Sequence, residues 1–121
     1  MDIPLQDIAG PYVAEGATPQ LTQVAWTAVD QTETHTFPIA SSAGTLLMVR
    51  GEAIATIAGT ITIHSSANKF GREADITAFG ATDGETYLRI FKRHGWENFP
   101  GSGLVSFEVS NANLEVAAIR L

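Results

Sequence analysis

The chain contains no cysteine among its 121 residues. This absence excludes a disulfide framework, thiolate metal ligands and a cysteine nucleophile. A domain of this length can bury a core without such cross-links. We therefore expect a single domain that is held together by packing and hydrogen bonding alone.

Basic residues are also few: seven Lys and Arg side chains stand against thirteen Asp and Glu, which gives a net charge of −6. An acidic chain repels nucleic acid unless its few basic side chains gather on one face. Long apolar runs are missing too, since none approaches the ~20 residues of a membrane span. The first seven residues lack the basic start and apolar core of a signal peptide. We expect a soluble protein made in the cytoplasm, with neither nucleic acid nor a membrane as its partner.

Segments with a helical period are absent, and alternation with a period of two takes their place. The clearest run covers residues 56–63, in which Ile57, Ile61 and Ile63 share one side and threonines occupy the other. Such alternation predicts a strand with one face in a core. Gly59 interrupts the apolar side, so we expect a bend in the strand at that point.

The same alternation recurs along the chain. For example, His35, Phe37 and Ile39 share one side of a further predicted strand. Turn signals separate such segments at intervals of roughly 8–12 residues, and Asp83-Gly84 is the strongest hairpin signal among them. The pattern predicts about eight short strands over residues 21–121, and hence an all-β fold that is an antiparallel sandwich or a jelly roll.

Residues 1–20 are interrupted by prolines and glycines and match neither a helix nor a long strand. We predict that they form an extended N-terminal arm attached to the sandwich. The arm carries four apolar side chains that cannot form a core by themselves: Ile3, Leu5, Ile8 and Tyr12. These side chains are candidates for burial on the same domain or in a contact between subunits, and we favour the subunit contact. A loose terminus is the alternative.

Motifs of known catalytic chemistry are missing. His35, His64 and His94 stand in no metal-ligand spacing, and no GxSxG nucleophile elbow occurs. A His/Asp/Ser set could be assembled from His64, Asp75 and Ser65, but serine and aspartate are common loop residues. We therefore expect a protein that is not an enzyme and that holds no cofactor or metal.

Two groups of residues between 89 and 103 are candidates for binding. Arg89 and Arg93 belong to a basic cluster that could receive an acidic partner surface, unless neighbouring carboxylates neutralise it. Trp96 and Phe99 lie in a long Gly-rich loop, and a simple connector would not require these two aromatic rings. Tryptophan is over-represented in protein interfaces, and it also stacks on sugar rings. We expect this loop to be exposed, and both kinds of partner stay open.

The arm, the small antiparallel domain, the missing cysteines and the terminal strand Val116–Leu121 together resemble tailed-phage virion proteins, in particular the head decoration or cement proteins. The resemblance extends over the whole chain and includes no diagnostic motif. It implies a structural protein of the virion, made in the host cytoplasm. Such a protein binds the assembled major capsid protein, commonly as a trimer, and stabilises the shell. Jelly-roll carbohydrate-binding modules, which the strand pattern and Trp96 also fit, are the alternative resemblance.

Overall fold

A computed structural model describes residues 1–8, 16, 21–39, 42–65, 75–98 and 101–121. Within these ranges the chain forms nine strands and no helix, so the described part offers no helix that could span a membrane. The strands are β1 (Leu5–Gln6), β2 (Thr27–Val29), β3 (His35–Pro38), β4 (Thr45–Gly51), β5 (Gly59–Ile63), β6 (Ile76–Ala81), β7 (Thr86–Phe91), β8 (Leu104–Val109) and β9 (Leu114–Arg120).

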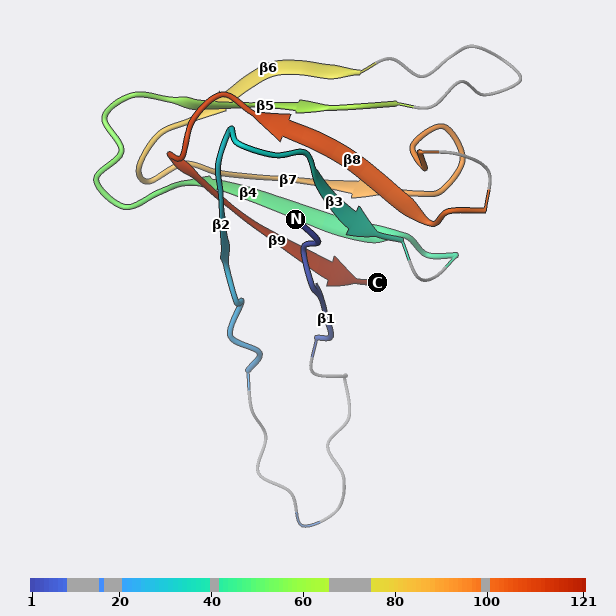
Figure 1. The fold of residues 1–121 in the computed structure, drawn as a ribbon. Coiled ribbons are helices and arrows are strands. Elements are labelled where there is room, and N and C mark those ends of the chain that lie inside the picture. The colour runs from blue at the N-terminus through green and yellow to red at the C-terminus, as the bar shows by residue number, and fades with distance from the viewer. Residues whose placement is uncertain (9–15, 17–20, 40–41, 66–74, 99–100) are drawn as a thin grey trace.

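The strands form two sheets that lie face to face (Figure 1). In the five-stranded sheet β7 pairs with β4 and β4 with β9, while β1 and β2 both pair with the other side of β9. The four-stranded sheet has the order β3-β8-β5-β6. Every pairing of these strands is antiparallel except that of β1 with β9. The predicted all-β sandwich is therefore confirmed, and its assignment as a jelly roll stays a prediction.

The core lies between the sheets, and period-two alternation selects the side chains that enter it. His35, Phe37 and Ile39 are buried together, as their shared side predicted. The ring of Phe37 contacts those of Phe91 and Phe107, with centroids 5.3 and 6.1 Å apart. Because these three phenylalanines come from β3, β7 and β8, their packing joins the two sheets.

The first six residues belong to the sandwich, which corrects the predicted boundary at residue 20. Ile3 is only 1% exposed and lies in the core, and its N–H donates to the carbonyl oxygen of Thr36 at 2.7 Å. Leu5 is partly buried in β1, which runs parallel to β9. Ile3 and Leu5 are thus buried on their own domain, without the subunit contact that we favoured. Ile8 is exposed, and Tyr12 lies outside the described residues.

The predicted strand over residues 56–63 begins only at Gly59, so its first part is wrong. Gly59 is buried, and a Cβ atom there would lie 2.6 Å from a side-chain carbon of Leu114, so the start of the strand has no room for a larger residue. Residues 52–58 instead form a loop between β4 and β5. Ile57, predicted to face the core, is 70% exposed in this loop.

Asp83-Gly84 forms a turn, but not the predicted hairpin. The N–H of Glu85 donates to the carbonyl oxygen of Thr82, and Gly84 has φ of +85° at the third turn position, which is typical of a type II turn. Two-residue hairpin loops prefer type I′ and type II′ turns, which are the mirror images of types I and II. The chain accordingly crosses here from β6 in one sheet to β7 in the other.

Ile54, in the loop between β4 and β5, has a backbone conformation that its side chain disfavours. Its φ is +62°, and it is 88% exposed, so no packing of its side chain offsets the strain. Replacing Ile54 by asparagine, which tolerates this conformation, is expected to raise the free energy of unfolding by about 1 kcal/mol. Urea denaturation of the two proteins measures the change. An unchanged or lower stability would contradict the assignment of strain to this residue.

Candidate functional site

His64, Ser65 and Asp75 do lie together, between the end of β5 and the start of β6. Asp75 is their common partner: its Oδ2 lies 3.3 Å from His64 Nδ1, and its Oδ1 accepts a 2.9 Å hydrogen bond from Ser65 Oγ. The backbone N–H of Ser65, then its hydroxyl and then His64 hold the pKa of Asp75 below its ordinary value. In a catalytic triad the histidine stands between the carboxylate and the serine. Here the carboxylate stands in the middle, so the cluster fixes the ends of a loop and does not form a triad.

The histidines of the described residues do not assemble a metal centre. No three His, Asp or Glu side chains come close enough to hold an ion in the part of the chain that the structure describes. His35 is buried, stacks on Phe107 with ring centroids 5.3 Å apart, and has its Nε2 2.8 Å from the carbonyl oxygen of Asp30. His35 is therefore a core residue at the start of β3.

The loop after β7 folds back onto the core. Trp96 is only 5% exposed, and its ring meets Phe91 edge-on with centroids 4.9 Å apart. The carboxylate of Glu97 accepts hydrogen bonds from the N–H groups of Gly103 and Gly101, which close the loop and lower the pKa of Glu97. The expectation of an exposed tryptophan is therefore wrong. Because the ring of Trp96 is buried, it offers no accessible face on which a sugar could stack. Phe99 lies outside the described residues.

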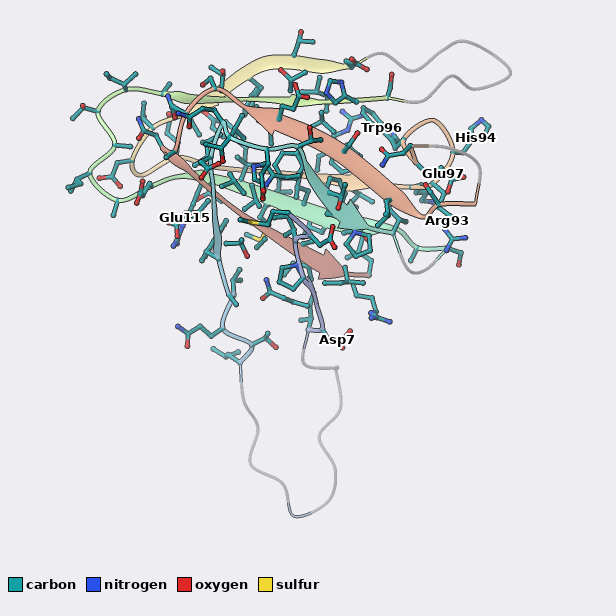
Figure 2. All side chains as sticks on the ribbon, viewed as in Figure 1. Asp7, Arg93, His94, Trp96, Glu97 and Glu115 are labelled. Atoms are coloured by element: carbon teal, nitrogen blue, oxygen red, sulfur yellow. The ribbon has the colours of Figure 1, made fainter. Side chains whose placement is uncertain are left out.

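The structure brings Arg89, Arg93 and Trp96 together at one end of the sandwich. Figure 2 shows Arg93, His94, Trp96 and Glu97 gathered in this region. Arg93 Nε donates to the carbonyl oxygen of Ile39 at 3.3 Å, and the guanidinium of Arg89 lies 5.5 Å from the centroid of the Trp96 ring. Arg89 forms no ion pair with any carboxylate of the described residues. Two further basic residues that could extend this cluster, Lys69 and Arg72, lie outside the described ranges.

A first apolar surface is the tip of the loop between β4 and β5, formed by Ile54 and Ile57. Both side chains are exposed, although the backbone that carries them is held in place. The N–H of Glu52 donates to the carbonyl oxygen of Asn113 at 2.9 Å. The side-chain amide of Asn113 donates in turn to the backbone carbonyl oxygen of Ile57 at 3.1 Å. Asp83 N–H donates to the carbonyl oxygen of Ala55 at 3.2 Å. The apolar tip is thus a fixed feature of the surface.

A second apolar surface lies along β7, at the edge of the five-stranded sheet. Leu88 and Ile90 are 63% and 54% exposed on one face of the strand. On the other face Tyr87 is half-exposed and meets Phe79 of β6 edge-on, with ring centroids 4.5 Å apart. Arg89 occupies the same inner face beside Phe91. The edge strand therefore exposes apolar side chains on its outer face, and an aromatic ring and a guanidinium on its inner face.

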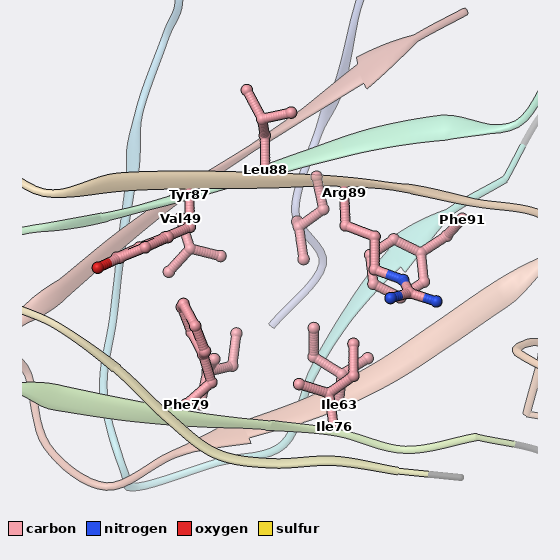
Figure 3. Close-up of a pocket in the computed structure, with 10 residues that line it drawn as sticks. Val49, Ile63, Ile76, Phe79, Tyr87, Leu88, Arg89 and Phe91 are labelled. Carbon is pink, nitrogen blue, oxygen red and sulfur yellow. The ribbon is translucent and has the colours of Figure 1, made fainter. Parts of the chain in front are cut away.

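Beside this edge the two sheets separate and leave an open cavity of about 310 Å³. Figure 3 shows Tyr87 and Arg89 pointing into it from β7, and Ile63, Ile76 and Phe79 facing them from the other sheet. Leu88 points away on the opposite side of the strand. The cavity is open because β6 and β7 lie at the same side of the sandwich and do not pair with each other.

The fold and these surfaces define the class of protein as a two-sheet β-sandwich with two exposed apolar surfaces. No protein-family model matches the chain, and comparisons with curated proteins and with solved structures find no significant match.

Sequence reasoning missed both apolar surfaces. Ile57 was predicted to face the core because it lies an even number of positions before Ile61 and Ile63, so that all three would share one face of a strand. The signal that could have corrected this is Ile54, which lies three residues before Ile57 and so breaks the period of two. For β7 no signal in the sequence distinguishes Leu88 and Ile90 from core residues, because alternation does not say whether a face is covered.

Proposed function

We propose that the protein is a non-enzymatic structural component of a virion, which binds the assembled major capsid protein as a decoration or cement protein and stabilises the shell. The apolar tip formed by Ile54 and Ile57 is the observation that carries this proposal. The resemblance to head decoration proteins supplies the identity of the partner, and it also implies association as a trimer. The tip supplies a surface through which such binding could occur.

The tip has the properties of a contact point on a protein. Fully burying an isoleucine side chain stabilises a complex by about 1.5–3 kcal/mol before the costs of ordering and association. The loop under Ile54 and Ile57 is braced by hydrogen bonds to residues 83 and 113, so its backbone is already in place before binding. A preformed loop loses little conformational entropy when a partner covers it.

The strain at Ile54 supports the same role. A β-branched residue at positive φ costs stability, and such residues persist where the conformation serves a function. Glycine or asparagine would satisfy the backbone at this position without cost. Folding therefore does not explain why isoleucine occupies position 54. Contact with an apolar surface on the shell would explain it, and the exposure of the side chain allows that contact.

Co-sedimentation with assembled phage heads that lack a decoration protein tests the proposal. The full chain is expected to sediment with the heads, and Ile54→Asn is expected to bind at least roughly tenfold more weakly although it folds more stably. Leu21→Asn is the matched control, because Leu21 is almost fully exposed on a different segment and its loss should leave binding unchanged. Failure of the full chain to sediment with heads would overturn the function, and equal binding of Ile54→Asn would exclude the apolar tip.

A further inference from the structure

We propose that β7 pairs with β7 of a second copy of this chain, antiparallel and across a two-fold axis, so that the five-stranded sheets of the two copies become continuous. This interface is independent of the shell-binding surface proposed above, because the apolar tip is a separate surface. It can be tested on the isolated protein, so its failure and the failure of the proposed function are distinguishable.

The backbone of β7 provides the first argument. Only β4 pairs with β7 among the described strands, so the backbone N–H and C=O groups on its other side face no strand there. Natural edge strands are protected by charged side chains, especially lysine or an inward-pointing charge, by proline, by a bulge or by extreme shortness. The one charged side chain of β7 is Arg89, whose guanidinium lies 5.8 and 5.5 Å from the ring centroids of Phe91 and Trp96. β7 is six residues long and contains neither lysine nor proline, and its pairing with β4 is regular throughout. It is therefore open to the addition of another strand.

The charges at the two ends of β7 identify a second copy as the occupant. Asp83 and Glu85 precede the strand, and Lys92 and Arg93 follow it. Antiparallel pairing of two identical strands sets the start of each against the end of the other. The acidic end of one copy then meets the basic end of its partner at both ends of the interface, which is the self-complementarity that a two-fold contact requires.

The side chains within β7 select the register. Residues opposite one another in an antiparallel pair lie on the same face, so Leu88 and Ile90 must face outward-pointing residues of the second copy. Centring the pair on Arg89 would set two guanidinium groups directly against each other, which is unfavourable. Centring it on Leu88 sets Leu88 against its own copy and Arg89 against Tyr87. The same register sets Arg93 against Asp83, so we infer an axis at Leu88.

The apolar residues of the edge fit this arrangement on both faces. On the outer face Leu88 and Ile90 of two copies would form a continuous strip. On the inner face the second copy would bring its Tyr87 and Arg89 beside the mouth of the 310 Å³ cavity, where the half-exposed ring of Phe79 lies. The pairing thus brings exposed side chains of the two copies into lateral contact across the seam.

Disulfide trapping tests the axis directly, and the absence of native cysteine makes each single-cysteine variant unambiguous. Leu88→Cys is expected to form a covalent dimer rapidly under a mild oxidant such as diamide, because opposed residues of paired strands have Cα atoms about 4.5–5.5 Å apart, within disulfide range. Ile90→Cys is the matched control, since the proposed register opposes it to Thr86. Slow cross-linking of Leu88→Cys, or faster cross-linking of Ile90→Cys, would overturn the register.

Sedimentation velocity over a range of concentrations tests the pairing without cross-linking. The full chain is expected to form dimers in place of the trimer that the resemblance implies. Leu88→Lys is expected to raise the dimer Kd at least roughly tenfold, because it brings two like charges together at the axis. Leu21→Lys is the control, since it places a lysine at an exposed leucine away from the edge and should leave the Kd unchanged. A monomer at every soluble concentration, or a trimer that Leu88→Lys leaves intact, would overturn the proposal.

Discussion

Replacing Ile3 by alanine is expected to lower the free energy of unfolding by about 2–5 kcal/mol. Ile3 is one of the largest fully buried side chains, and its removal leaves a cavity between β1 and the core. Typical domains have only about 5–15 kcal/mol of stability in total. Urea denaturation followed by tryptophan fluorescence measures the change.

Ile8→Ala is the matched control, because Ile8 is the same residue type in the same segment but is exposed, and its replacement should change stability by less than about 0.5 kcal/mol. Removing residues 1–8 altogether should cost more than Ile3→Ala, since it also removes the pairing of β1 with β9 and the hydrogen bonds to Thr36. Equal stabilities of Ile3→Ala and Ile8→Ala would mean that the N-terminal segment is the detachable arm which the sequence predicted.

Replacing Gly51 by alanine is expected to cost about 3 kcal/mol or more. Gly51 ends β4 beneath the turn between β6 and β7, and a Cβ atom there would lie 2.0 Å from the carbonyl oxygen of Thr82. Its N–H also donates to the carbonyl oxygen of Glu85 at 3.1 Å. Because the obstacle is backbone, an added methyl group must push the turn away and separate the two sheets at this end.

Gly84→Ala separates this spatial effect from backbone strain. Gly84 lies in the same turn with φ of +85° but has open space around its Cα, so alanine there should cost only about 1–2 kcal/mol. Urea denaturation of both variants supplies the comparison. If Gly51→Ala proves the milder of the two, the close approach of β4 to the turn is not present in solution.

Local patterning predicted the fold class of this chain well. Alternation identified the buried side of β3, because a strand presents every second side chain to the core whatever its partners are. The same rule placed Ile61 and Ile63 correctly in β5. It failed at Ile57, since the rule describes side chains within a strand and cannot say where a strand begins.

The candidate surfaces could not be predicted in the same way. Trp96 was expected to be exposed because it lies in a long loop that would not require an aromatic ring as a simple connector. In the structure, the N–H groups of Gly101 and Gly103 donate to the Glu97 carboxylate, and Trp96 is buried. Leu88 and Ile90 have the alternation of core residues, yet β7 lies at a sheet edge where their face is uncovered. Both outcomes depend on contacts that form only in the folded chain, and local sequence patterns do not show which residues will become neighbours.

By itself the sequence determined that the chain forms short strands, that these pack as an all-β sandwich, and which side of most strands is apolar. These properties are local, because backbone geometry sets the period of the side chains. Only the tertiary structure decided that Ile3 completes the core, that Asp83-Gly84 crosses between sheets, and that β7 stands at an open edge. These depend on which strands become neighbours, and strand order is chosen by the packing of the whole chain.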